Sequence, residues 1–178
     1  GGWPQRYPLM YDHPFQGEAD YTSFITLNDD VIPENIDFLI QCYQTLGMQD
    51  LKEPIYRAMN LSLILQQGAP YAGWADQYTV ADLQPAHARS YEPRSVNTGT
   101  TIHMIQKMED YYRLTGDTKF LSGIPAAIQF LESMKLPESE VKKFGRRHLG
   151  TDEILVPRFI QPETGKPLYV HRKGSNIA

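Results

Sequence analysis

A twelve-residue segment, QPAHARSYEPRS at positions 84–95, concentrates polar side chains between two prolines. Proline restricts the backbone, so an arginine in this segment can be held rigidly, and its planar guanidinium can bind a carboxylate by paired hydrogen bonds. Arg89 and Arg94 are the candidates for such an anion site. The plainer alternative is that both pair with Glu92 along a solvated loop. His87 is either a base or a structural residue that caps a turn, and we favour the structural role.

Three oxygen-bearing side chains, Asn28, Asp29 and Asp30, come directly before a segment with helical periodicity. Such side chains commonly cap the free amide groups at the N-terminus of a helix. Capping requires only one of them, and hard cations such as Ca²⁺ prefer clustered carboxylate and amide oxygens. Taken alone, the spacing favours capping, with metal binding as the alternative.

Two further arginines fall on a predicted β-hairpin. The strings ILVPRFIQ and PLYVHR alternate like strands around the turn PETGK, and they carry Arg158 and Arg172. Arginines on exposed strands are common, but two on one hairpin can also clamp a carboxylate.

Several classes of site and partner find no support in the sequence. It contains no HExxH zinc pattern, no GxSxG serine motif and no GxxxxGK phosphate loop. Its basic residues do not gather on one helix face with aromatic residues between them, so we expect no nucleic-acid partner. No apolar run is long enough to predict a membrane span. Cys42 is the one cysteine, and its apolar surroundings predict a buried, inert thiol.

The elements that must position these residues are mainly helical. Proline and glycine mark the ends of four segments with helical spacing, at about 33–46, 54–67, 100–114 and from 125 onward. About thirty residues without regular periodicity separate the second helix from the third, and loops of that length are usually functional or disordered. The two aromatic clusters in this loop argue against disorder. We therefore expect one mainly α domain over 1–178, built of stacked helical hairpins with long loops and a small β-hairpin.

Charge divides unevenly along the chain. The first 84 residues carry 11 acidic and 3 basic side chains, whereas the remaining residues carry 10 acidic and 14 basic ones. This distribution can place an acidic spot beside a basic one, which suits a carboxylated substrate.

Five strings, in this order, resemble the pectate lyases of polysaccharide lyase family ten. They are GGWPQRYPL, FITLNDDVI, GWADQYTVADLQPAHARSYEPRS, YYRLTGDTKFL and PRFIQPETGKPLYVHRKG, and the resemblance extends over nearly the whole chain. It implies an α/α toroid, secreted or periplasmic, with small β elements beside a long cleft for polygalacturonate. It also implies a calcium-assisted β-elimination. Family members usually have an earlier helical section with another calcium-binding aspartate, so the chain resembles the larger C-terminal part of a lyase domain, a partial domain truncated at both ends.

The resemblance also assigns roles. It implies that Arg89 is the catalytic base, that Asp29 and Asp30 belong to a Ca²⁺ site, and that Arg158 and Arg172 bind substrate carboxylates. We expect a monomer that acts on polygalacturonate or a related acidic polysaccharide. A non-catalytic module that binds acidic polysaccharide, and a scaffold of helical hairpins without uronate affinity, are the alternatives. A guanidinium is normally protonated, so a basic role for Arg89 requires burial and nearby cations that favour its neutral form.

Overall fold

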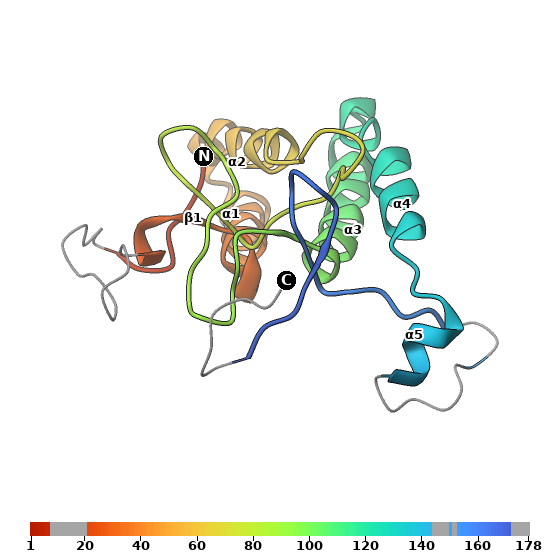
Figure 1. The fold of residues 1–178 in the computed structure, drawn as a ribbon. Helices are drawn as coiled ribbons and strands as arrows, with labels where there is room; N and C mark the ends of the chain where they lie inside the picture. Colours follow the sequence, from red (N-terminus) through yellow and green to blue (C-terminus); the bar gives the residue numbers. More distant parts are fainter. Residues whose placement is uncertain (8–20, 144–149, 151–152, 172–178) are drawn as a thin grey trace.

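The structure is a computed structural model that describes residues 1–7, 21–143, 150 and 153–171 (Figure 1). Within them, two helical pairs, α1 with α2 and α3 with α4, form the scaffold. The helices are α1 (Val31–Leu46), α2 (Lys52–Ile64), α3 (Thr98–Thr115), α4 (Ile124–Ser133) and α5 (Glu138–Lys143). Short 3₁₀ turns cover Tyr21–Ser23, Asn28–Asp30, Gln49–Leu51 and Thr118–Leu121. The mainly helical prediction is confirmed, and none of the described helices is long and apolar enough to cross a membrane.

Glycine and asparagine set the limits of the long helices. Gly47 and Gly116 follow α1 and α3 in the left-handed conformation, with φ of 66° and 70°, which glycine adopts without a steric penalty. The Asn97 side chain caps α3 by accepting hydrogen bonds from the amides of Gly99 and Thr100. Helix α2 ends three residues earlier than the sequence predicts, because the amide of Gln67 donates to the carbonyl of Gly73 and turns the chain.

In the described part of the chain, five strands of two residues each form two small sheets. Strand β1 (Ile25–Thr26) pairs antiparallel with β2 (Gln77–Tyr78). A second sheet has the order β3 (Val96–Asn97), β4 (Phe159–Ile160) and β5 (Pro167–Leu168), all antiparallel. The predicted hairpin is thus confirmed, although each strand has only two residues. Its turn packs closely: a Cβ at Gly165 would lie 2.3 Å from the ring of Tyr71.

The long loop between α2 and α3 is ordered around Trp74, which is fully buried. The indole Nε1 donates to the carbonyl of Ser62 on α2 at 2.8 Å, and the Trp74 amide donates to Thr101 Oγ1 on α3 at 3.0 Å. The carbonyl of Trp74 accepts from the amide of Asn97 at 2.8 Å. Trp74 therefore joins α2, α3 and β3, and it holds the polar loop in a fixed position on the scaffold.

Cys42 departs from its prediction, because it is half-buried and not buried. The buried residues of α1 are Ile32, Pro33 and Ile36. Six residues after Ile36, Cys42 lies roughly 120° around the helix from it, since an α-helix has 3.6 residues per turn. The apolar run around Cys42 is thus wider than the face that α1 buries.

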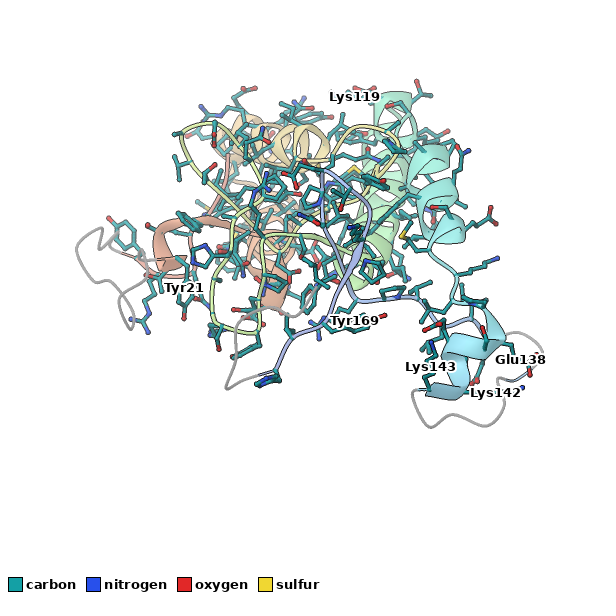
Figure 2. All side chains as sticks on the ribbon, viewed as in Figure 1. Tyr21, Lys119, Glu138, Lys142, Lys143 and Tyr169 are labelled. Atoms are coloured by element: carbon teal, nitrogen blue, oxygen red, sulfur yellow. The ribbon has the colours of Figure 1, made fainter. Side chains whose placement is uncertain are left out.

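Helix α5 is short, lies at one edge of the molecule and carries exposed ion pairs (Figure 2). Lys142 Nζ lies 3.0 Å from Glu138 Oε1, and Lys143 Nζ lies 2.5 Å from Glu140 Oε1. Exposed pairs of this kind contribute little to stability.

Candidate active site

An open cavity of about 610 Å³ lies where the turn before α1, the loop between α2 and α3, and the first turn of α3 meet. Its lining includes Asp29, Asp30, Arg89 and Arg158. The structure thus brings together four of the five site residues that the sequence singles out, from segments up to 129 positions apart. The fifth, Arg172, lies outside the described residues. Acidic and basic groups stand side by side in one hollow, as the charge distribution suggests.

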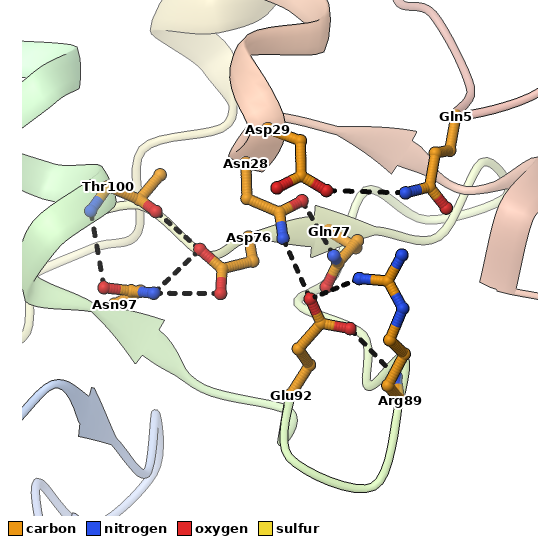
Figure 3. Close-up of polar contacts among 9 residues, drawn as sticks. All are labelled: Gln5, Asn28, Asp29, Asp76, Gln77, Arg89, Glu92, Asn97 and Thr100. Atoms are coloured by element: carbon orange, nitrogen blue, oxygen red, sulfur yellow. Dashed lines mark hydrogen bonds and ion pairs between the residues drawn. The ribbon is translucent and has the colours of Figure 1, made fainter.

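The aspartate loop, Asn28–Asp30, does not cap α1. Asp30 occupies the N-cap position, but its side chain accepts no hydrogen bond from the helix amides, so the capping interpretation is wrong. Asp29 and Asp30 are both left-handed, with φ of 52° and 55°. The carboxylate of Asp30 instead contacts α3, with Oδ1 3.1 Å from His103 Nδ1. Asp29 Oδ2 accepts a hydrogen bond from Gln5 Nε2 at 3.5 Å (Figure 3).

Arg89 pairs with Glu92, which is buried. Arg89 NH1 donates to Glu92 Oε1 at 3.1 Å, and the Arg89 backbone amide donates to Glu92 Oε2 at 3.1 Å. The guanidinium carbon also lies 5.5 Å from the ring centre of Tyr21, within range of a cation–π contact. The side chain of Arg89 remains 30% exposed, at the wall of the cavity. Arg89 is therefore held by a carboxylate, by its own backbone and by an aromatic ring.

These surroundings keep Arg89 protonated. Partial burial lowers the pKa of the guanidinium, but the charge of Glu92 and the interactions with Tyr21 and Tyr91 outweigh it, so the pKa of Arg89 lies above its ordinary value. This differs from the expectation that nearby cations favour the neutral form. Among the described residues, the group that forms an ion pair with the guanidinium is a carboxylate.

Arg94, the other arginine of the segment, binds elsewhere. Its NH1 forms an ion pair with Glu163 at the turn of the β4–β5 hairpin, and its Nε donates to the carbonyl of Pro85 at 3.1 Å. The alternative that both arginines pair with Glu92 is therefore right for Arg89 and wrong for Arg94. Arg94 thus joins the loop to the hairpin. His87, two residues before Arg89, is half-buried.

Sequence reasoning missed a buried carboxylate behind the cavity. Asp76 is 5% exposed. Asn97 Nδ2 donates to both of its oxygens at 2.9 Å, and Thr100 Oγ1 donates to Oδ1 at 2.5 Å (Figure 3). Burial raises the pKa of Asp76, although these hydrogen bonds and the charge of Arg158 act in the opposite direction. The one sequence signal is an acidic residue placed two positions after the aromatic Trp74 and two positions before Tyr78.

Comparison with known proteins gives the family of this chain. A family model described as pectic acid lyase matches residues 1–177. The chain belongs to the pectic acid lyase family. A comparison with curated proteins finds no match.

Two solved structures are similar to this pectic acid lyase family member. One is family 10 polysaccharide lyase from Cellvibrio cellulosa, with a TM-score of 0.74, 16% identity and 98% of this chain covered. The other is an aspartate-to-alanine mutant of that lyase in complex with trigalacturonic acid, with the same TM-score and identity and 99% coverage. At this identity the likeness shows the fold. The chain spans 57% of the length of each of these structures.

The pectic acid lyase chain offers oxygen donors of the kind that Ca²⁺ prefers. Asn28, Asp29 and Asp30 are consecutive, and all three line the cavity. Ca²⁺ takes about six to eight oxygen ligands, which include water and ligand oxygens. In the described part of the chain, no group of three His, Cys, Asp or Glu side chains is placed to hold a metal ion. The aspartate loop thus offers part of the oxygen ligands that a Ca²⁺ ion would take.

Asp76→Asn should remove a pH-dependent loss of stability in this family member. Because burial raises the pKa of Asp76 above its ordinary 3.8, the folded protein binds this proton more tightly than the unfolded chain. The stability that this proton provides is present below pH 3.8 and is lost as the pH rises through the folded pKa. The amide side chain of the variant cannot ionise, so the unfolding free energy of the wild type should fall relative to that of the variant over this range. Urea unfolding at a series of pH values measures the difference, and parallel pH profiles would contradict the prediction.

Proposed function

We propose that this chain forms the larger part of the catalytic domain of a calcium-dependent pectate lyase, which cleaves polygalacturonate by β-elimination. The observation that carries the proposal is the cavity that gathers Asp29, Asp30, Arg89 and Arg158 in a chain of the pectic acid lyase family. The similarity to a lyase in complex with trigalacturonic acid supports a uronate substrate.

The reaction removes the proton on the carbon next to the uronate carboxylate. The electron pair of that C–H bond forms a carbon–carbon double bond, and the glycosidic C–O bond breaks. Its electron pair leaves with the oxygen, which then takes a proton from water. The proton is weakly acidic because the carbanion forms beside a negative group. Positive charge placed at the carboxylate therefore stabilises the transition state, and this is commonly the largest contribution to catalysis.

The arginines of the cavity suit these two tasks. Arg158 is exposed at the cavity wall, and a guanidinium can bind a carboxylate by two parallel hydrogen bonds. Arg172 is proposed to share this role. Arg89 is proposed as the base that accepts the proton. The hydrogen bond from its backbone amide to Glu92 holds the main chain of Arg89 at the edge of the cavity, within reach of a bound substrate.

Calcium would be held by Asp29 and Asp30, with the amide oxygen of Asn28 beside them. It supplies positive charge for the substrate carboxylate. The proposed complete protein contains further helices that close the α/α toroid, since this chain covers 57% of the length of the similar structures. We further propose that it is secreted or periplasmic and acts as a monomer.

The assay that tests the function is the appearance of unsaturated product from polygalacturonate. With Ca²⁺, absorbance from the new carbon–carbon double bond should rise with time, and addition of a chelator should stop the rise. Restoring Ca²⁺ should restore the rate, whereas Mg²⁺ serves as the control, because it demands smaller octahedral sites.

The second candidate is a non-catalytic module that binds acidic polysaccharide. The ion pair between Arg89 and Glu92 favours it, because a guanidinium paired in this way is a poor proton acceptor. Retained binding to polygalacturonate without any unsaturated product would support this module over the lyase.

A further inference from the structure

The carboxylate of Glu92 connects the two polar loops of the cavity. From residues that the structure describes it accepts three hydrogen bonds, two from Arg89 through the backbone amide and NH1, and one from Asn28 Nδ2 at 3.2 Å (Figure 3). Asn28 is itself fixed, since its Oδ1 accepts from Gln77 Nε2 at 2.8 Å. Oε1 of Glu92 is therefore shared between the arginine loop and the residue that precedes Asp29.

The burial of Glu92 makes its hydrogen bonds to Arg89 and Asn28 important for stability. Glu92 is 7% exposed. A buried carboxylate is costly unless charge and hydrogen bonds compensate it, so Glu92 needs the donors that surround it. Arg89, with its more exposed side chain, does not depend on Glu92 in the same way, because water or another anion can take over its donors.

The three donors differ in how they can move. The backbone amide of Arg89 and the Asn28 side chain are fixed by the loop and by Gln77. The guanidinium is the donor that can leave by side-chain rotation alone. After it leaves, Glu92 still accepts two hydrogen bonds, so its carboxylate stays partly compensated while the arginine turns toward a ligand in the cavity.

We propose that Glu92 is a positioning residue that holds the protonated Arg89 at the cavity wall, and that Arg89 acts as a base only after its guanidinium leaves Glu92 and releases one proton to solvent. This inference rests on the proposed function, since it names what controls the proposed base. It agrees with the electrostatics, in which the charge of Glu92 raises the pKa of Arg89 against the effect of burial.

The test measures the reactivity of Arg89 directly. Phenylglyoxal reacts with the neutral form of a guanidine, and mass spectrometry of peptides gives the labelling rate of each arginine. In Glu92→Gln the charge is lost while the size of the side chain is kept. Arg89 should then be labelled about tenfold faster, which corresponds to a change of one pKa unit. A labelling rate for Arg89 equal to that of the wild type would overturn the proposal.

Glu163→Gln is the matched control, because it removes the partner of the other arginine in the same loop. It should accelerate the labelling of Arg94 and leave that of Arg89 unchanged.

Glu92→Asp separates charge from packing, since it keeps the carboxylate but shortens its reach. It should accelerate the labelling of Arg89 less than Glu92→Gln does, and equal acceleration would assign the effect to a loosened loop and overturn the proposal. If Glu92→Gln does not fold, a wild-type labelling rate in Glu92→Asp overturns it.

Two readouts separate this inference from the function itself. Labelling needs no turnover, so it decides the role of Glu92 even in a protein that forms no unsaturated product. In an active protein, the rising limb of the pH–rate profile should move to lower pH in Glu92→Gln. Absence of product in the wild type would contradict the proposed lyase function. An unchanged pH–rate profile in an active Glu92→Gln variant would contradict the proposed role of Glu92.

Discussion

Arg89→Lys is expected to lower the rate of unsaturated product formation by about 10²–10⁴-fold, the usual contribution of a general base. Lysine keeps the positive charge but lacks the planar fork that contacts Glu92 Oε1, and its shorter head group cannot take the same place at the cavity wall. Absorbance of the product at saturating polygalacturonate and Ca²⁺ gives the rate, and circular dichroism checks the fold. Wild-type activity in this variant would remove Arg89 from the role of base.

Arg94→Lys is the matched control, since it makes the same change five residues away. Arg94 pairs with Glu163, which joins the loop to the hairpin, and it donates to the carbonyl of Pro85 within the loop. An exposed ion pair contributes at most about 1 kcal/mol, so the activity should change by less than about tenfold. A loss as large as that of Arg89→Lys would show that loop position, and not the chemistry of one guanidinium, controls the rate.

Trp74→Ala is expected to lower the free energy of unfolding by about 3–5 kcal/mol, as large-to-small changes of buried aromatic residues do. Trp74 is fully buried, and the variant also leaves the carbonyl of Ser62 without the indole donor. Domains have a total free energy of unfolding of about 5–15 kcal/mol, so this loss is a large fraction of the total. Urea unfolding followed by circular dichroism measures the loss.

The control for Trp74→Ala is Ile64→Ala. Ile64 ends α2 and is 64% exposed, so its truncation should change the unfolding free energy by no more than about 0.5 kcal/mol. A small loss in Trp74→Ala, similar to this control, would mean that the loop between α2 and α3 does not depend on its tryptophan anchor.

Local chemistry in the sequence predicts the helices well. Proline at helix starts and glycine at helix ends act within a few residues, and α1 ends at Leu46 before Gly47 as expected. The contrast is the N-terminus of α1, where local chemistry predicts capping. The left-handed Asp30 pairs instead with His103, 73 positions away, and no local pattern contains that partner.

The sequence predicted which residues line the candidate site, but it did not predict which residues they contact. The loop between two prolines pointed to Arg89 and Arg94, and the family resemblance singled out Arg89. The carboxylate three positions later was the simplest partner for it. The expectation of nearby cations came from the reaction and not from the residues, and the structure places Glu92 there. Asp76 escaped prediction because its donors, Asn97 and Thr100, lie beyond the loop at the start of α3.

The backbone conformation of the aspartate loop affects the result of any selection for higher stability. A left-handed conformation costs a residue other than glycine roughly 1–2 kcal/mol, and Asp29 and Asp30 adopt it in succession. Glycine at either position would relieve that cost. Directed evolution for heat resistance alone should therefore select glycine at these two positions. The most heat-resistant variants would then lack the two carboxylates that line the cavity.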